Sequence, residues 1–132
     1  MTEDRKLEDL HCATVAALVE LAQALKDAEE SDDQEAWESA AQAIEEDPLS
    51  VMVRDGWRVP GGESSGAEEF EILLCTGGPA TRIVGQLEDG YPVNFRVEVQ
   101  DWFRPWESFV GMTGAQGDLI RGYYLNRFFL GD

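Results

Sequence analysis

Apolar and polar side chains alternate strictly along residues 93–100, and this alternation constrains the fold more than any other feature of the sequence. The apolar positions are Val93, Phe95, Val97 and Val99, and the polar positions are Asn94, Arg96, Glu98 and Gln100. Because successive side chains of a β-strand point to opposite faces, the pattern predicts a strand with one buried face and one polar face. Such a strand needs neighbours that share its buried face.

Two preceding segments are suitable neighbours. Residues 70–75 (FEILLC) and 81–87 (TRIVGQL) also alternate, and we expect Phe70, Ile72, Leu74, Ile83, Gly85 and Leu87 to face inward. The connecting stretches contain Gly77-Gly78-Pro79 and Asp89-Gly90, which are compositions typical of hairpin turns. We therefore predict a three-stranded antiparallel β-meander over residues 68–102.

The register of this meander follows from matching the inward faces. The match pairs Leu74 with Ile83, Ile72 with Gly85, Phe70 with Leu87, Gly85 with Phe95, and Leu87 with Val93. An aromatic ring beside Gly85 would cover the bare backbone there. On the polar face, the same register predicts a row of Cys75, Arg82 and Glu98 across the three strands.

An apolar stripe predicts a first helix from about Leu7 to Glu29. Its members are Leu7, His11, Thr14, Leu18, Leu21, Leu25 and Ala28, a spacing typical of one face of a helix. The stripe needs a partner, and two candidates remain open. One is the next helix of the same chain, which a short connection favours. The other is the same helix of a second copy, which would make a homodimer.

A second helix should follow closely. Ser31 and Gln34 have the spacing of a capping box, so we expect Ser31 to begin this helix after a connection of about two residues around Glu30-Ser31. Asp47-Pro48 should end it, because a residue before proline is pushed out of the α region. Residues 1–47 are therefore predicted to form an antiparallel helical hairpin.

The remaining segments complete a single domain over residues 1–132. Residues 49–55 suit either a strand or a short helix opened by Asp47-Pro48, and residues 60–67 (PGGESSGA) have the composition of a flexible loop. After the aromatic-rich stretch QDWFRPWESF and a glycine-rich linker, a last helix is expected from about Asp118 to Leu130, packed on the core. The class is α+β, with the hairpin followed by an α+β part over residues 48–132.

The formal net charge is −17 and is unevenly distributed. Residues 1–50 contain 15 acids and 3 bases, a net of −12, and residues 51–132 contain 12 acids and 7 bases, a net of −5. Such a field repels nucleic acid and anionic membranes and attracts basic protein surfaces. The same acidity is also typical of a solvated face that keeps a protein soluble, and of the composition of a salt-adapted source.

The N-terminal sequence carries acids where a signal peptide has basic and then apolar residues. No apolar run approaches the roughly 20 residues that span a bilayer. We therefore expect a cytoplasmic protein that binds no membrane. In that compartment Cys12 and Cys75 should remain thiols. With a single histidine, His11, the chain has few ligands for a metal site built from cysteine and histidine.

Cys75 and Arg82 invite comparison with the loop of cysteine phosphatases. Arg82 lies one residue further from the cysteine than the arginine of that loop, Leu74 stands where that loop usually has a histidine, and Pro79 removes an amide that a phosphate cradle needs. The one histidine leaves few options for a base. A carboxylate pair drawn from Glu68, Glu69, Glu71, Glu98 and Asp101 is the other source of acid–base chemistry. We expect no catalytic, cofactor or metal residues.

The stretches EFEILLCTGGPATRIVGQL (69–87) and EVQDWFRPWESF (98–109) resemble a family of small bacterial proteins from proteobacterial genomes and mobile elements. The likeness covers roughly residues 47–109 and depends on ILLCTGGPA and VQDW. It implies no established activity and no catalytic residue. A mobile-element origin would favour interference with a host machine.

These patterns predict a non-enzymatic, strongly acidic protein-interaction module. Its surfaces would be the helical hairpin and a polar sheet face, for which the candidate residues are Cys75, Arg82, Arg96, Glu98, Trp102 and Trp106. The expected partner is a protein with a basic surface, not nucleic acid itself, although Trp102, Arg104 and Trp106 could stack bases. In a sharper form, the hairpin imitates nucleic acid and blocks a host defence or DNA-processing protein. The alternative is a small hydrolase or transferase that uses Cys75 or paired carboxylates.

Overall fold

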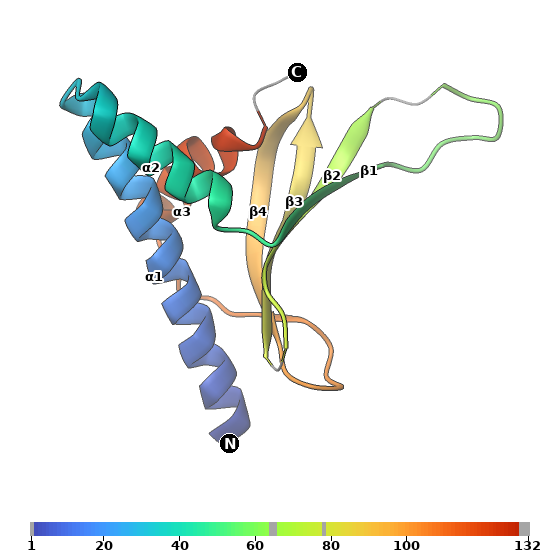
Figure 1. Ribbon diagram of the computed structural model, residues 1–132. Coiled ribbons are helices and arrows are strands. Elements are labelled where there is room, and N and C mark those ends of the chain that lie inside the picture. The colour runs from blue at the N-terminus through green and yellow to red at the C-terminus, as the bar shows by residue number, and fades with distance from the viewer. Residues whose placement is uncertain (1, 64–65, 78, 130–132) are drawn as a thin grey trace.

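The computed structural model describes residues 2–63, 66–77 and 79–129 and has two layers (Figure 1). Helices form one layer and a five-stranded antiparallel sheet forms the other, so the predicted α+β class is confirmed. The helices pack on the sheet chiefly through β4. Within the described ranges, no helix is both long enough and apolar enough to cross a membrane.

The first helix, α1 (Thr2–Glu30), buries the predicted stripe within the same chain. Leu7, His11, Leu18, Leu25 and Ala28 are all buried. The covering elements are α2, strand β4 and the C-terminal helical segment. The intramolecular partner is therefore confirmed, and the stripe needs no second copy to cover it.

The second helix, α2 (Gln34–Glu46), begins later than predicted. Asp33, not Ser31, is its N-cap, since the Asp33 carboxylate accepts a hydrogen bond from the amide of Ala36 at 3.1 Å. Ser31 instead belongs to the end of α1, where its hydroxyl donates to the carbonyl of Ala28. Asp32 turns the chain with a φ of 55°. The predicted end is confirmed, because α2 stops at Glu46, directly before Asp47 and Pro48.

The sheet has five strands where three were predicted, in the order β1-β2-β3-β4-β5. The strands are β1 (Ser50–Asp55), β2 (Ala67–Cys75), β3 (Ala80–Glu88), β4 (Tyr91–Gln100) and β5 (Glu107–Ser108). The three predicted strands form its centre, and each edge carries one more. The open question of residues 49–55 is resolved as a strand, because the β-branched pair around Met52 extends the ladder beside β2.

The register between β2 and β3 differs from the prediction by two residues. Ile72 lies opposite Ile83 and Phe70 lies opposite Gly85. A two-residue slip leaves every side chain on the same face, so the inward set of these two strands was predicted correctly even though its pairs were not. A bulge between Leu73 and Cys75 shifts the register by one residue, and it places Cys75 opposite Thr81 rather than Arg82.

The register between β3 and β4 is confirmed in its centre and wrong at its end. Gly85 lies opposite Phe95, and Arg82 lies opposite Glu98, as predicted. Leu87, however, pairs with Pro92 instead of Val93, because the ladder shifts between Gln86 and Leu87. This irregularity turns Val93 outward, where it is exposed.

The C-terminal helical segment starts at Gly114 and not at Asp118. It runs through α3 (Gly114–Leu119), a π-helical turn, η1 (Ile120–Tyr124), and a 3₁₀ turn, η2 (Leu125–Arg127). Thr113 and Gln116 form a capping box that starts the helix despite its glycines. Tyr124 is fully buried, and its hydroxyl donates a 2.7 Å hydrogen bond to Asp47. The segment ends at Arg127, before the predicted end, since Phe128 and Phe129 are not helical; Leu130 itself lies outside the described residues.

Gly85 sits where the core leaves no space for a side chain. A methyl group there would meet the backbone carbonyl oxygen of Asn94, and it would lie 2.8 Å from the ring of Phe70. The aromatic ring that covers this glycine is therefore Phe70 of β2. Substitution must displace a strand or a buried ring.

We predict that Gly85→Ala lowers the free energy of unfolding by about 1–3 kcal/mol through overpacking. Urea denaturation measures the change. Gly117→Ala is the matched control, because a methyl group on this helical glycine meets nothing within 4 Å and alanine favours a helix. Equal stability of Gly85→Ala and the unmodified protein would contradict the packing described.

His11 joins three parts of the fold. It is 3% exposed on α1, hydrogen bonds to the backbone of Val97 in β4, and lies edge-on to Phe109 with ring centroids 5.6 Å apart. Burial lowers the pKa of His11 below its ordinary value of 6.5, although the Val97 hydrogen bond and nearby Glu8 oppose the shift. The folded protein therefore holds a neutral imidazole more readily than the unfolded chain does.

This lowered pKa sets a direction for stability against pH. Because the unfolded chain binds the proton more tightly, the free energy of unfolding should fall as pH drops below 6.5, until it passes the folded pKa. We expect His11→Gln to lose this dependence between about pH 7.5 and 5.5, above the range where carboxylates titrate. Urea midpoints at both pH values measure it. The same slope in both proteins would assign the effect to other groups.

Candidate functional site

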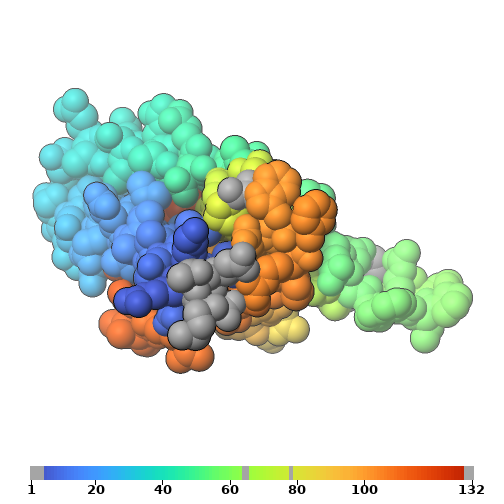
Figure 2. All heavy atoms as spheres, turned by 90° about the horizontal axis from the view of Figure 1, so that it is seen from below, coloured from blue at the N-terminus to red at the C-terminus, as the bar shows by residue number. Residues whose placement is uncertain are grey.

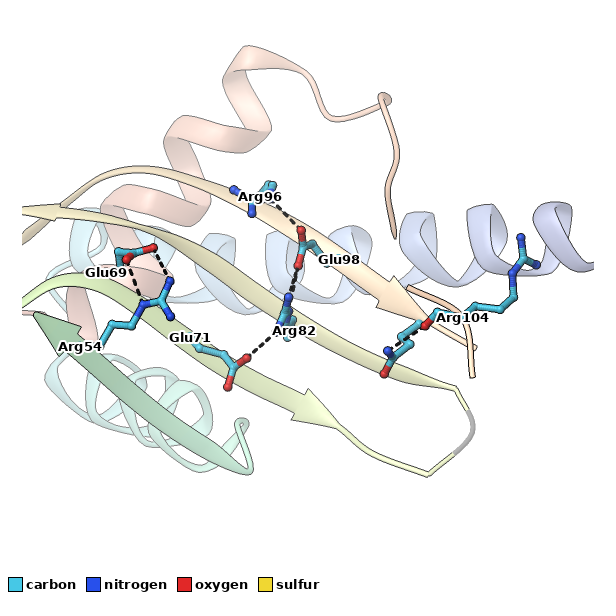
Figure 3. Close-up of polar contacts among 8 residues, drawn as sticks. Arg54, Glu69, Glu71, Arg82, Arg96, Glu98 and Arg104 are labelled. Atoms are coloured by element: carbon cyan, nitrogen blue, oxygen red, sulfur yellow. Dashed lines mark hydrogen bonds and ion pairs between the residues drawn. The ribbon is translucent and has the colours of Figure 1, made fainter. Parts of the chain in front are cut away.

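The sheet face that points away from the helices carries a row of alternating arginines and glutamates. Its members come from four strands and are Arg54 of β1, Glu69 and Glu71 of β2, Arg82 of β3, and Arg96 and Glu98 of β4 (Figure 3). We call these six residues the polar row. They arise from strand alternation, since the positions between them face the helix layer.

Glu98 is the centre of the polar row. Its carboxylate accepts hydrogen bonds from Nε of Arg82 at 2.8 Å and from Nε of Arg96 at 2.7 Å. Arg82 also donates from Nη1 to Glu71 at 2.6 Å, so one guanidinium bridges two carboxylates (Figure 3). The side chain of Glu98 is only 9% exposed. A buried carboxylate with two arginine partners is fixed in position.

The arginines also determine the charge state of Glu98. Burial raises the pKa of this carboxyl, but the hydrogen bonds from Arg96 and Arg82 outweigh burial, and the pKa lies below its ordinary value of 4.5. Glu98 therefore stays ionised at neutral pH. A general acid needs the opposite shift, so the geometry gives Glu98 a positioning role within the row and no proton to donate.

Trp106 covers the middle of the row. The guanidinium carbon of Arg82 lies 4.1 Å from the centre of the Trp106 ring, which is a cation–π distance. Trp106 reaches this place because β5 returns the chain to the edge of β4. Arg82 is thus held by two carboxylates and one ring, and its side chain is 21% exposed.

The outer end of the polar row is open to solvent. Arg54 donates from Nε and Nη2 to the two oxygens of Glu69, at 2.9 and 3.1 Å. The hydrogen bond from Arg54 lowers the pKa of Glu69. Both side chains are substantially exposed, and such pairs contribute little to stability. Arg54 and Arg96 are the cations of the row that solvent reaches most easily.

A hollow of about 680 Å³ lies between β1 and β4 over this face. Besides members of the polar row, its lining contains two amides, Gln86 and Asn94, and the residues Met52, Val53, Phe70, Val84, Gly85 and Phe95. Gln86 and Asn94 bond to each other across the strands, at 2.8 Å between side chains. The hollow therefore combines paired charges and amides with apolar side chains.

Four of the six residues predicted for this surface gather here. They are Arg82, Arg96, Glu98 and Trp106. Cys75 lies off the polar row, because its sulfur is 3.2 Å from the hydroxyl of Thr81, which shares the helix-facing side with Ile83. Trp102 lies in the turn after β4, with its ring centroid 6.3 Å from that of Phe103.

Sequence reasoning missed Arg54, Glu69 and Glu71 as members of the row. The slipped register paired Cys75 with Arg82, and the correct one brings Glu71 within reach of Arg82 instead. Arg54 was missed because its strand was unassigned. Glu69 and Glu71 could have been identified from their spacing. They are two positions apart in β2, which places both side chains on the outward face.

The two cysteines are both free, and Cys12 is exposed on α1. Across the part of the chain that the structure describes, no three His, Cys, Asp or Glu side chains are grouped so that they could hold a metal ion.

We predict that Glu98→Gln lowers the free energy of unfolding by about 1–3 kcal/mol, because two arginines lose a charged partner. Glu69→Gln, at the exposed end of the row, should cause no measurable change. The pKa of Glu98 is lowered on folding, so the difference between Glu98→Gln and the unmodified protein should be largest above pH 4.5 and should shrink as pH falls through the folded pKa. Urea denaturation from neutral to acidic pH checks both statements, and equal effects of the two substitutions would refute them.

Comparisons of the chain with protein-family models, with curated proteins and with solved structures found no match.

Proposed function

We propose that the chain is a protein-binding module that recognises a basic surface on a partner protein through its acidic helical hairpin. One observation carries the proposal. Every described acidic residue from Glu8 to Asp47 is exposed to solvent, and the first 50 residues have a net charge of −12. A basic partner would be attracted and oriented by such a field before contact.

The contrast with the sheet supports this proposal. On the sheet, Glu69, Glu71 and Glu98 are each paired with an arginine. Residues 1–50 contain 3 bases against 15 acids. Arg127 reaches back to pair with Glu45 at 2.8 Å, but one such pair changes the balance little. Most hairpin carboxylates therefore keep their charge available to a partner's lysines and arginines.

Several hairpin carboxylates are also held in place by neighbouring glutamines. Gln23 donates to Asp27, Gln34 donates to Glu38, and Gln42 donates to Glu46, each at a distance between 2.8 and 3.0 Å. Each pair is four residues apart, which places both side chains on one helix face. A glutamine leaves the negative charge of its neighbour intact while reducing its rotamer freedom, which lowers the entropy lost on binding.

In its sharper form, the proposal is that the hairpin imitates nucleic acid. Carboxylates displayed along two antiparallel helices would take the place of phosphates in a basic nucleic-acid site of a defence or DNA-processing protein. A chain with this charge would not bind nucleic acid directly. Binding to such a protein should therefore displace its DNA.

Affinity capture from cell lysate at low and moderate salt tests the proposal with two variants of equal charge change. The hairpin variant combines Glu20→Gln, Glu30→Gln and Glu38→Gln. The control variant combines Glu63→Gln, Glu88→Gln and Asp118→Asn, which are also exposed but lie elsewhere. We expect basic proteins to be enriched by the unmodified chain and by the control, and to be reduced at least about threefold by the hairpin variant.

Two results would count against the proposal. One is failure to enrich any basic protein even at low salt, and the other is equal enrichment by the hairpin and control variants. For the sharper form, fluorescence anisotropy of labelled duplex DNA bound to a captured protein should fall as the chain is added. DNA that stays bound while the chain also binds would exclude imitation of nucleic acid.

A further inference from the structure

Exposed apolar side chains gather along one edge of the sheet. Leu49, Val51, Met52, Val53, Trp57 and Val59 are all exposed, and Trp57 is fully so. They lie in β1 or directly beside it, and β1 is the edge strand next to β2. Figure 1 shows β1 on the side of the sheet remote from α1, and Figure 2 shows the segment after it projecting from the body. An edge strand offers unpaired backbone groups along its outer side.

The apolar side chains on the helix-facing side of the sheet continue from the core onto this edge. Val51 lies opposite Ile72, and Val53 lies opposite Phe70, so both valines share the helix-facing side of the sheet. Ile72 and Phe70 are buried, whereas Val51 and Val53 are 39% and 52% exposed. The helices pack chiefly on β4, and their cover ends before it reaches β1. The apolar side chains of β1 on this side of the sheet are thus left uncovered by the helices.

We propose that β1 pairs with β1 of a second copy, antiparallel about a two-fold axis at Met52, so that the two sheets become one. A two-fold axis perpendicular to the sheet keeps the helix-facing side the same in both copies. Opposed residues must then share a face. Centring on Met52 puts Met52 opposite Met52 and Val51 opposite Val53, so apolar side chains meet on both faces. Arg54 lies opposite Ser50, and no like charges are opposed.

Charge favours a second copy over a foreign basic segment at this edge. Residues 49–57 (LSVMVRDGW) contain one arginine and one aspartate, so this stretch has no net charge. A basic strand would meet no net negative charge here. A neutral apolar strand of the same pattern would bury its apolar side chains against this edge without a charge mismatch. The acids that make copies repel each other are concentrated in residues 1–50, and salt screens such repulsion beyond about 8 Å at physiological ionic strength.

Trp57 helps the strand pair to reach the size of a specific interface. A standard interface buries about 800 Å² on each partner, and one tryptophan can bury about 150–250 Å². Leu49 precedes β1 and Trp57 follows it. Antiparallel pairing therefore brings the segment after one β1 beside the segment before the other, and each Trp57 can cover a Leu49 of the second copy.

Sedimentation equilibrium of the full chain tests the pairing. The mass should rise from 14.7 kDa towards twice that value as the concentration increases, and added salt should strengthen the association. Met52→Lys puts two like charges at the axis and should abolish the rise in mass. Val93→Lys changes an exposed valine away from this edge and should leave it. Circular dichroism confirms that both variants fold.

Cross-linking tests the register even if Met52→Lys fails to fold. In a background of Cys12→Ser and Cys75→Ser, Met52→Cys should form a disulfide-linked dimer under mild oxidation, because residues directly opposite on antiparallel strands lie within disulfide range. Val93→Cys should form no disulfide-linked dimer, because position 93 lies in β4, away from the paired edge.

Three outcomes would overturn the pairing. They are a mass of 14.7 kDa at every concentration, an association that weakens with salt, and equal cross-linking at positions 52 and 93. Capture of a foreign protein that Met52→Lys abolishes, from a chain that is itself monomeric, would assign the edge to that protein. These measurements leave the hairpin acids unchanged, so they can fail without affecting the proposed function.

Discussion

Burial of one face of β3 and β4 beneath the helices is the constraint on which the rest of the structure depends. Ile83, Val97 and Val99 are at most 1% exposed. Since strand side chains alternate, a dry helix-facing side leaves every second position for the opposite face. The six charged residues of the polar row are therefore confined to the opposite face, where they lie close enough to pair. Arg82 bridges Glu71 and Glu98 as a direct result.

The chain thus carries its charge in two different ways. On the sheet, arginines and glutamates neutralise each other, and the paired groups have little charge left for a distant partner. On the hairpin, acids far outnumber bases and project a field into solvent. The apolar edge of β1 is a third kind of surface, since it has no net charge and its apolar side chains are exposed. The proposed recognition by charge and the proposed association through backbone pairing therefore use separate parts of the molecule.

The sequence predicted features that depend on local pattern and missed those that depend on pairing. Alternation alone placed Gly85 opposite Phe95 and Arg82 opposite Glu98, because the turn between these strands is short. The β2–β3 register slipped by two residues, since faces repeat with that period and cannot distinguish the alternatives. The start of the last helix was hidden by Gly114, whose low helix propensity is overcome by the capping box. The candidate site was predicted only in part for the same reason. Its members on β3 and β4 were predicted, whereas Glu71, the partner of Arg82 on β2, could be identified only with the true register.

The order of elements along the chain has a consequence for synthesis. Each strand pairs with its neighbour in sequence, so the meander can form progressively, with little loop-closure entropy at each step. The first helix is different, because its apolar stripe is covered partly by β4 and η1, which lie far along the chain. On a ribosome, α1 emerges before β4 and η1 do. Until β4 and η1 have been synthesised, α2 is the one described covering element available to the apolar stripe of α1.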